Sequence, residues 1–191
     1  PYTDPLVSPM EPASGFAPEY QPHIQDSELC ATCHTLFTPY LDNEGQIAGE
    51  FPEQTAYLEW LNSDFVRDEV SCQDCHMPPT GDTLFALPEV GGLEHPPETI
   101  PSHLQLGATS VDLLQDAVSV TFEAVRSGDQ ITVHVTIINT KTGHHIPTDF
   151  PGRHMILTVT ATNADGEVLT LTEGSMVPEW GGEEAGLPGQ A

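Results

Sequence analysis

All four cysteines of the 191-residue chain lie in two five-residue motifs of the same form, C-A-T-C-H at 30–34 and C-Q-D-C-H at 72–76. In such a motif the two thiols can add to the vinyl groups of a haem, and the histidine that follows can ligate the haem iron. The motifs therefore predict two haem c groups. The thioether links are expected from Cys30, Cys33, Cys72 and Cys75, and the proximal iron ligands are expected to be His34 and His76.

Three other uses of paired cysteines compete with haem attachment. A structural zinc site does not require a histidine directly after each second cysteine. A redox dithiol needs one Cys-x-x-Cys pair in a βαβ setting, and neither motif is flanked by predicted strands. Two disulfides in a secreted chain would use the same thiols, but they would leave both histidines without a role. The repeated histidine therefore favours haem.

The residues that precede each motif are typical of short helices. The segment 26–28, Asp-Ser-Glu, is typical of a helix start and predicts a short helix that carries the first motif. Ahead of the second motif, apolar residues recur at helical spacing through 52–67, which predicts another helix. Its large aromatic side chains, Trp60 and Phe65, are expected to pack in a small core or against a haem.

The function of a haem protein depends on the ligand at the second axial position of the iron. A histidine or methionine there makes an electron carrier, whereas an open position permits ligand binding or catalysis. Met77 directly follows His76, so it cannot reach around to the same iron. Bis-histidine coordination is favoured because histidines are in surplus. Those that remain after the proximal pair are His23, His95, His103, His134, His144, His145 and His154.

Sequence context ranks these histidines as distal ligands. His103 lies in the loop I-P-S-H-L-Q-L-G and is one expected ligand. The turn G-H-H-I-P-T carries adjacent imidazoles, and one of them, His144 or His145, is the other. His23 lies close to the first motif and is a further alternate. His134 alternates with valines on a predicted strand and is expected to be a surface residue.

The chain is strongly acidic, with 29 Asp and Glu residues against four Lys and Arg, for a formal charge of -25. Such a surface repels phosphate backbones and anionic lipid headgroups, which excludes nucleic acid and membrane surfaces as partners. No apolar stretch is long enough to cross a membrane, so no membrane insertion is expected. With 18 Pro, 16 Gly and a hydrophobic fraction of 38%, the chain is expected to have a modest core and many loops.

The predicted fold class is α+β. Residues 1–110 are expected to form a loop-rich dihaem region with a few short helices, and residues 111–175 a small antiparallel β domain. Its strands are expected at 118–122, 131–137, 156–159 and 167–172. Four strands are fewer than an immunoglobulin-like sandwich needs, so a partial, sandwich-like domain is expected. Residues 176–191, rich in Gly and Glu, are expected to be a tail.

Three longer segments carry a family resemblance. They are T-A-Y-L-E-W-L-N-S-D-F through S-C-Q-D-C-H-M-P, then S-H-L-Q-L-G, then I-I-N-T-K-T-G-H-H-I-P-T with the following G-R-H-M-I-L-T-V. Through them the chain resembles multihaem c-type cytochromes whose last haem sites precede an immunoglobulin-like β-sandwich domain. The resemblance implies that His103 is a haem ligand and matches His144 to the first histidine of the strand-turn-strand signature. The chain departs from the family in having only two haem motifs and in carrying Asp149 where the family has glycine.

These features predict an electron carrier rather than an enzyme. Thioether-linked haem occurs outside the reducing cytoplasm, so the protein is expected to be periplasmic or extracellular. Its expected partners are other redox proteins or copies of itself, because extracellular cytochrome filaments resemble this arrangement and a histidine of one subunit can ligate a haem of the next. A haem enzyme or sensor with one open axial site, or a docking module of a larger multihaem oxidoreductase, is the alternative.

Overall fold

The computed structural model describes residues 11, 12 and 14–191. It is a mixed α/β structure of short helices and small antiparallel sheets, in agreement with the predicted α+β class. The chain divides into two compact units, one that ends at His145 and one from Ile146 to Ala191. Both cysteine motifs belong to the first unit, together with all the candidate distal ligands except His154.

The helices are short because proline and polar capping residues interrupt the apolar pattern. In the first unit they are η1 (Pro22–Gln25), α2 (Glu28–Ala31), α3 (Ala56–Leu61), α4 (Asp64–Arg67), α5 (Cys72–His76), η2 (Pro88–Val90), η3 (Pro97–Thr99) and α6 (Val111–Ala117). A short helix begins where the sequence predicts one, but α2 ends at Ala31, so it carries Cys30 and leaves Cys33 and His34 in the turn that follows. The helix predicted over 52–67 is two helices, because Ser63 Oγ accepts a hydrogen bond from Phe65 N at 3.2 Å and starts α4 afresh.

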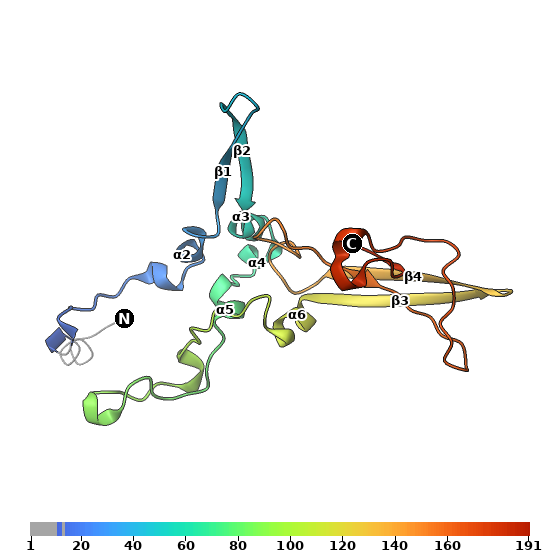
Figure 1. The fold of residues 1–191 in the computed structure, drawn as a ribbon. Helices are drawn as coiled ribbons and strands as arrows, with labels where there is room; N and C mark the ends of the chain where they lie inside the picture. The colour runs from blue at the N-terminus through green and yellow to red at the C-terminus, as the bar shows by residue number, and fades with distance from the viewer. Residues whose placement is uncertain (1–10, 13) are drawn as a thin grey trace. The chain divides into compact units, whose positions relative to one another are not determined.

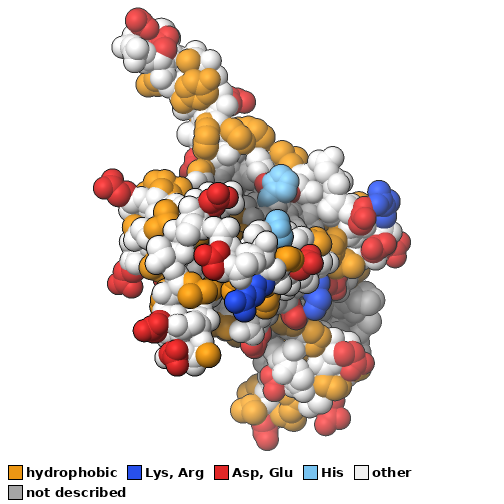
Figure 2. Space-filling model, turned by 90° about the vertical axis from the view of Figure 1, so that its right-hand side faces the viewer, with side chains coloured by type: hydrophobic (Ala, Val, Ile, Leu, Met, Phe, Trp, Pro, Cys, Tyr) orange, Lys and Arg blue, Asp and Glu red, His pale blue; other side chains and the backbone are white. Residues whose placement is uncertain are grey.

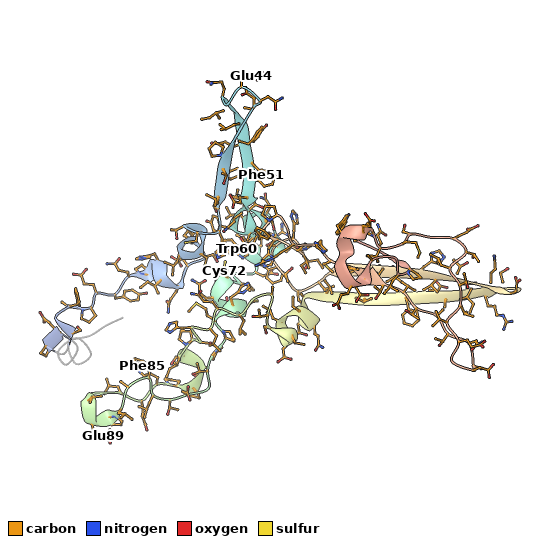
Figure 3. All side chains as sticks on the ribbon, viewed as in Figure 1. Glu44, Phe51, Trp60, Cys72, Phe85 and Glu89 are labelled. Carbon is orange, nitrogen blue, oxygen red and sulfur yellow. The ribbon has the colours of Figure 1, made fainter. Side chains whose placement is uncertain are left out.

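A hairpin that the sequence analysis did not predict, β1 (Leu36–Leu41) with β2 (Ile47–Gln54), lies between the two motifs along the chain (Figure 1). Asp42 organises its turn, because Asp42 Oδ1 accepts hydrogen bonds from Glu44 N at 3.0 Å and from Gln46 N at 2.8 Å. Figure 3 shows Glu44 at the tip of this hairpin. The region before residue 110 therefore contains regular β structure as well as loops.

A longer hairpin follows α6. It is formed by β3 (Val118–Ser127) and β4 (Gln130–Asn139), which confirms two of the predicted strands. Paired residues of a two-stranded sheet share a face, so the register separates the side chains by polarity. One face is apolar and includes Phe122, which is 77% exposed, and the other includes the polar pair of Glu123 and His134. The predicted surface position of His134 agrees with this register.

In the second unit, regular pairing is limited to short stretches. β5 (Leu157–Thr158) falls within the strand predicted at 156–159, but it pairs with β6 (Gly189–Gln190) rather than with residues 167–172. An isolated bridge between Thr162 and Val168 closes a turn at 163–166. The described residues thus form three separate two-stranded sheets.

The last residues of the chain are ordered into this second unit. Residues 176–191, expected as a tail, contain the 3-10 helix η4 (Glu179–Glu184) as well as β6. Val177 is 2% exposed, and a Cβ added at Gly181 would lie 2.4 Å from its Cγ1. This close approach is why the segment has glycine there.

The hydrophobic core is small. Among the described residues, the buried apolar side chains are Ile100, Ala117 and Val177. Phe51 on the first hairpin and Phe85 in the loop before η2 are exposed (Figure 3). In Figure 2, apolar side chains lie at the surface beside many carboxylates. A chain of this length normally buries many more apolar residues, so its own side chains supply little of the packing.

Candidate haem-binding site

The two cysteine motifs are joined by hydrogen bonds within the first unit. Ser27, immediately before α2, is 2% exposed, and its Oγ accepts a hydrogen bond from Cys72 N at 3.0 Å. Gln73 Nε2 donates to the carbonyl oxygens of Ile24 at 3.1 Å and Asp26 at 2.9 Å. The start of α5 is therefore bound to the segment that leads into α2, although the two are far apart in sequence.

The second motif is helical because polar residues cap it locally. Ser71 precedes α5, and its backbone N and its Oγ both donate to Asp74 Oδ2, at 2.7 and 2.8 Å. This is a capping-box arrangement, which satisfies backbone groups at the start of a helix. One helical turn then carries Cys72, Cys75 and His76 on neighbouring faces, as attachment to a single haem requires.

The sulfur atoms of the two motifs differ in their surroundings. The four cysteines carry thiols in the structure; Cys33 is exposed and the other three are half-buried. Burial raises the pKa of the Cys30 thiol, and the neighbouring Cys72 raises it further. Burial also raises the pKa of the Cys75 thiol, with Asp74 adding to the effect. The thiols of Cys30 and Cys72 share a hydrogen bond, so one sulfur of each motif lies beside one of the other.

The imidazole opposite His76 belongs to His144. The two ring centroids are 6.1 Å apart, and the ring planes are inclined by 23°. His76 lies at the end of α5, and His144 lies in the turn that follows β4. Of the histidines ranked as distal ligands, His144 is thus the one that the fold brings to the second motif.

Both of these imidazoles are oriented by a backbone carbonyl. His76 Nδ1 lies 2.5 Å from Leu106 O, and His144 Nδ1 lies 2.9 Å from His145 O. A carbonyl oxygen can only accept, so each Nδ1 must carry the proton, and each neutral ring keeps a lone pair on Nε2. Histidines that ligate metals are commonly held in this way, with the second ring nitrogen bonded to a carbonyl or carboxylate.

The spacing of this pair fits one iron between the two rings. With a metal–nitrogen bond of about 2 Å and roughly 1 Å from nitrogen to ring centre on each side, the centroids of two axial imidazoles lie about 6 Å apart. The observed separation is 6.1 Å. This separation leaves room for one iron between the two imidazoles, and thiols at Cys72 and Cys75 with imidazoles at His76 and His144 are the groups that would hold a haem there.

The turn that carries His144 is held by its own polar residues. Asn139, the last residue of β4, donates from Nδ2 to His144 O at 2.7 Å. Asn139 Oδ1 accepts hydrogen bonds from Thr142 N at 3.2 Å and Thr142 Oγ1 at 2.7 Å. Gly143 packs so closely on α3 that an added Cβ would lie 2.8 Å from Trp60 Cδ1. These contacts fix the backbone on both sides of His144.

Trp60 links this turn to the second motif. Its Nε1 donates to Val70 O at 2.9 Å, just before α5 begins. Figure 3 shows Trp60 and Cys72 in the same region of the first unit. The predicted aromatic side chain therefore packs against the candidate site.

The other candidate histidines occupy different positions. His34, His23 and His103 are exposed. The loop that carries His103 runs beside the residues after α5, with Ser102 N donating to Pro78 O at 2.9 Å, but the ring opposite His76 is that of His144. His145, the alternate, is exposed, and its Nδ1 lies 3.4 Å from Glu59 Oε1.

The remaining histidines contact aromatic rings or lie on a strand. The ring of His95 lies 4.7 Å from that of Phe85. In the second unit, His154 meets Trp180 edge to face at 4.9 Å. Across residues 11, 12 and 14–191, no three His, Cys, Asp or Glu side chains form a group suited to a metal ion. A haem iron takes its in-plane ligands from the porphyrin, so two axial histidines suffice.

Several residues that build the site were not predicted. They are Ser27, Glu59, Leu106 through its carbonyl, and Asn139. The sequence context of Ser27 indicates only a local helix start, whereas its hydroxyl also accepts the hydrogen bond from Cys72 N at the start of α5. An asparagine at a strand end before a Gly-containing turn is a usable signal for Asn139, because such side chains bond to nearby backbone groups.

Comparison with family models, with curated proteins and with solved structures gives no significant match to this chain. In the part of the chain that the structure describes, no helix has the length and apolar character needed to span a membrane. The function is therefore inferred from the residues of the site.

Proposed function

We propose that this protein is an electron carrier with two covalently attached c-type haems, each ligated by two histidines. Cys30 and Cys33 hold the first haem and Cys72 and Cys75 the second, with His34 and His76 as proximal ligands. The observation that carries the proposal is the pair of His76 and His144, whose rings are 6.1 Å apart and both have Nδ1 at a backbone carbonyl.

A haem with histidine on both faces supplies reversible one-electron chemistry and leaves no open position for a substrate. The chain's own contribution is to orient the ligands. Hydrogen bonds from Nδ1 to Leu106 O and His145 O make the imidazoles more basic, which is a recognised means of tuning a metal centre. The hydrogen bond between Ser27 and Cys72 keeps the two motifs together, which supports electron transfer between close haems.

The distal ligand of the first haem comes from an exposed histidine. His103 is the leading candidate within the chain, because the sequence favours it as a ligand, it is exposed, and the ring opposite His76 is that of His144. His23 and His145 are exposed alternates. The same position can be filled by a histidine of a second copy, which would join the haems of successive copies into a filament.

The remaining parts of the proposal concern location and the β domain. Haem c chemistry places the protein in the periplasm or outside the cell. The apolar face of β3 and β4 supports the partial sandwich domain, since an isolated two-stranded hairpin is only marginally stable in water. The -25 charge suits cationic or redox-protein partners and keeps the carrier away from nucleic acid.

Haem content tests this proposal. We expect a pyridine haemochrome assay to give two haems per chain, and we expect the haems to stay on the denatured protein because the links are covalent. Colourless protein, or protein whose haem is lost on denaturation, would refute the proposal. Carbon monoxide binding by one of the two ferrous haems would instead support the alternative of a sensor or enzyme with one open axial site.

A further inference from the structure

We infer that Glu59 is a positioning residue that holds His144 at the iron of the second haem. The inference rests on the proposed function and deepens it, because it assigns a role at the same site to a residue that is not one of the proposed haem ligands. Glu59 lies on α3, far from the turn in sequence.

The Glu59 carboxylate is anchored on both oxygens. Its side chain is 11% exposed. Oε1 accepts a hydrogen bond from Thr55 Oγ1 at 2.6 Å, which fixes the carboxylate to the start of α3. Oε2 accepts a hydrogen bond from His145 N at 2.8 Å. A carboxylate this buried is costly to leave unpaired, so it holds the backbone N–H that reaches it.

The backbone of His145, which Glu59 binds, orients the neighbouring side chain of His144. His145 N is bound by Glu59, and His145 O accepts the hydrogen bond from His144 Nδ1 at 2.9 Å. The same residue that Glu59 fixes therefore sets the orientation of the His144 ring. The contact between Gly143 and Trp60 holds the other side of His144 to the same helix.

A shallow hollow of about 410 Å³ lies where α3 meets the turn, and Glu59, Asn62, Asn139, His144 and His145 contribute to its lining. The backbone at this place is thus not supported by a filled apolar core. Besides the packing of Gly143 on Trp60, polar contacts hold the turn, and the Glu59 carboxylate joins α3 to His145 at both its backbone N and its Nδ1.

Variants of Glu59 distinguish the effect of the length of its side chain from the effect of its charge. Glu59→Asp keeps the charge but withdraws the carboxylate by about 1.5 Å, one carbon–carbon bond. Glu59→Gln keeps the reach and an accepting oxygen but removes the charge. We expect Glu59→Asp and Glu59→Ala to bind carbon monoxide at one more haem per chain than the unmodified protein, with two haems still attached. We expect Glu59→Gln to match the unmodified protein.

Glu123→Asp, on the polar face of β3, is the matched control and should leave carbon monoxide binding unchanged. If Glu59→Ala does not fold, the Asp and Gln variants decide the matter alone. The inference is wrong if the Asp variant binds no additional carbon monoxide, or if the Gln variant binds as much as the Asp variant. Failure of the proposed function shows separately, as fewer than two haems on the unmodified chain.

Discussion

At the scale of single residues, the candidate site depends on which nitrogen of each imidazole carries a proton. Leu106 O and His145 O each face an Nδ1, so both lone pairs at Nε2 are available to a metal. His144 is distinguished from its neighbour His145 by this contact and by its ring facing His76. Sequence alone left the choice between the two histidines open.

Replacing His144 with alanine should leave the second haem attached through Cys72 and Cys75 but remove one axial ligand. About half of the haem should then change from low spin to high spin, because one of two irons is affected. Absorption and electron paramagnetic resonance spectra measure this change.

His134→Ala is the control, because His134 lies on the polar face of β4, opposite Glu123. Its spectrum should match that of the unmodified protein. An unchanged spectrum for His144→Ala would contradict the assignment of His144 to the second haem.

At the scale of elements, local sequence patterns predict several strands and helices, but they do not predict the contacts between elements that are far apart in sequence. The strands at 118–122 and 131–137 and the helix at the first motif could be predicted, because their periodicity and capping signals are local. The first hairpin was missed because its strands contain Pro39 and Pro52, which argue against strands.

The residues of the candidate site likewise fall into two groups, those that a local motif predicts and those that only long-range contacts bring together. Its cysteines and proximal histidines follow from a contiguous motif, so the sequence alone predicts them. The pairing of His76 with His144, and of Ser27 with Cys72, depends on contacts across the first unit. No local pattern records such contacts, which is why the sequence names His103 and one of His144 and His145 as distal ligands without assigning either to a haem.

The packing of the turn on α3 gives an element-scale prediction. Gly143→Ala should cost about 1–3 kcal/mol of folding stability, because the added methyl group overpacks against the Trp60 ring and must displace it. The shift should also disturb the neighbouring His144 and create a high-spin fraction. Denaturant titration and the absorption spectrum measure the two effects.

Gly107→Ala is the matched control, since the nearest atom to its added Cβ is Gln105 O at 4.0 Å. It should change the denaturation midpoint little. Equal midpoints for the Gly143 and Gly107 variants would show that the turn is not tightly packed on α3.

At the scale of the whole molecule, the shortage of core residues and the surplus of acidic charge both disfavour a compact fold. Among the described residues, three apolar side chains are buried, and the formal charge of the chain is -25. Self-repulsion of this size opposes a compact state. Two covalently bound haems would add apolar surface within the first unit, around which its loops and short helices can pack.

An experimental density map of the protein with its haems attached tests the central claim most directly. We predict that Nε2 of His76 and Nε2 of His144 lie on opposite faces of the haem joined to Cys72 and Cys75. A different ligand opposite His76, or zinc or disulfides at the cysteines in place of thioether links, would contradict the account.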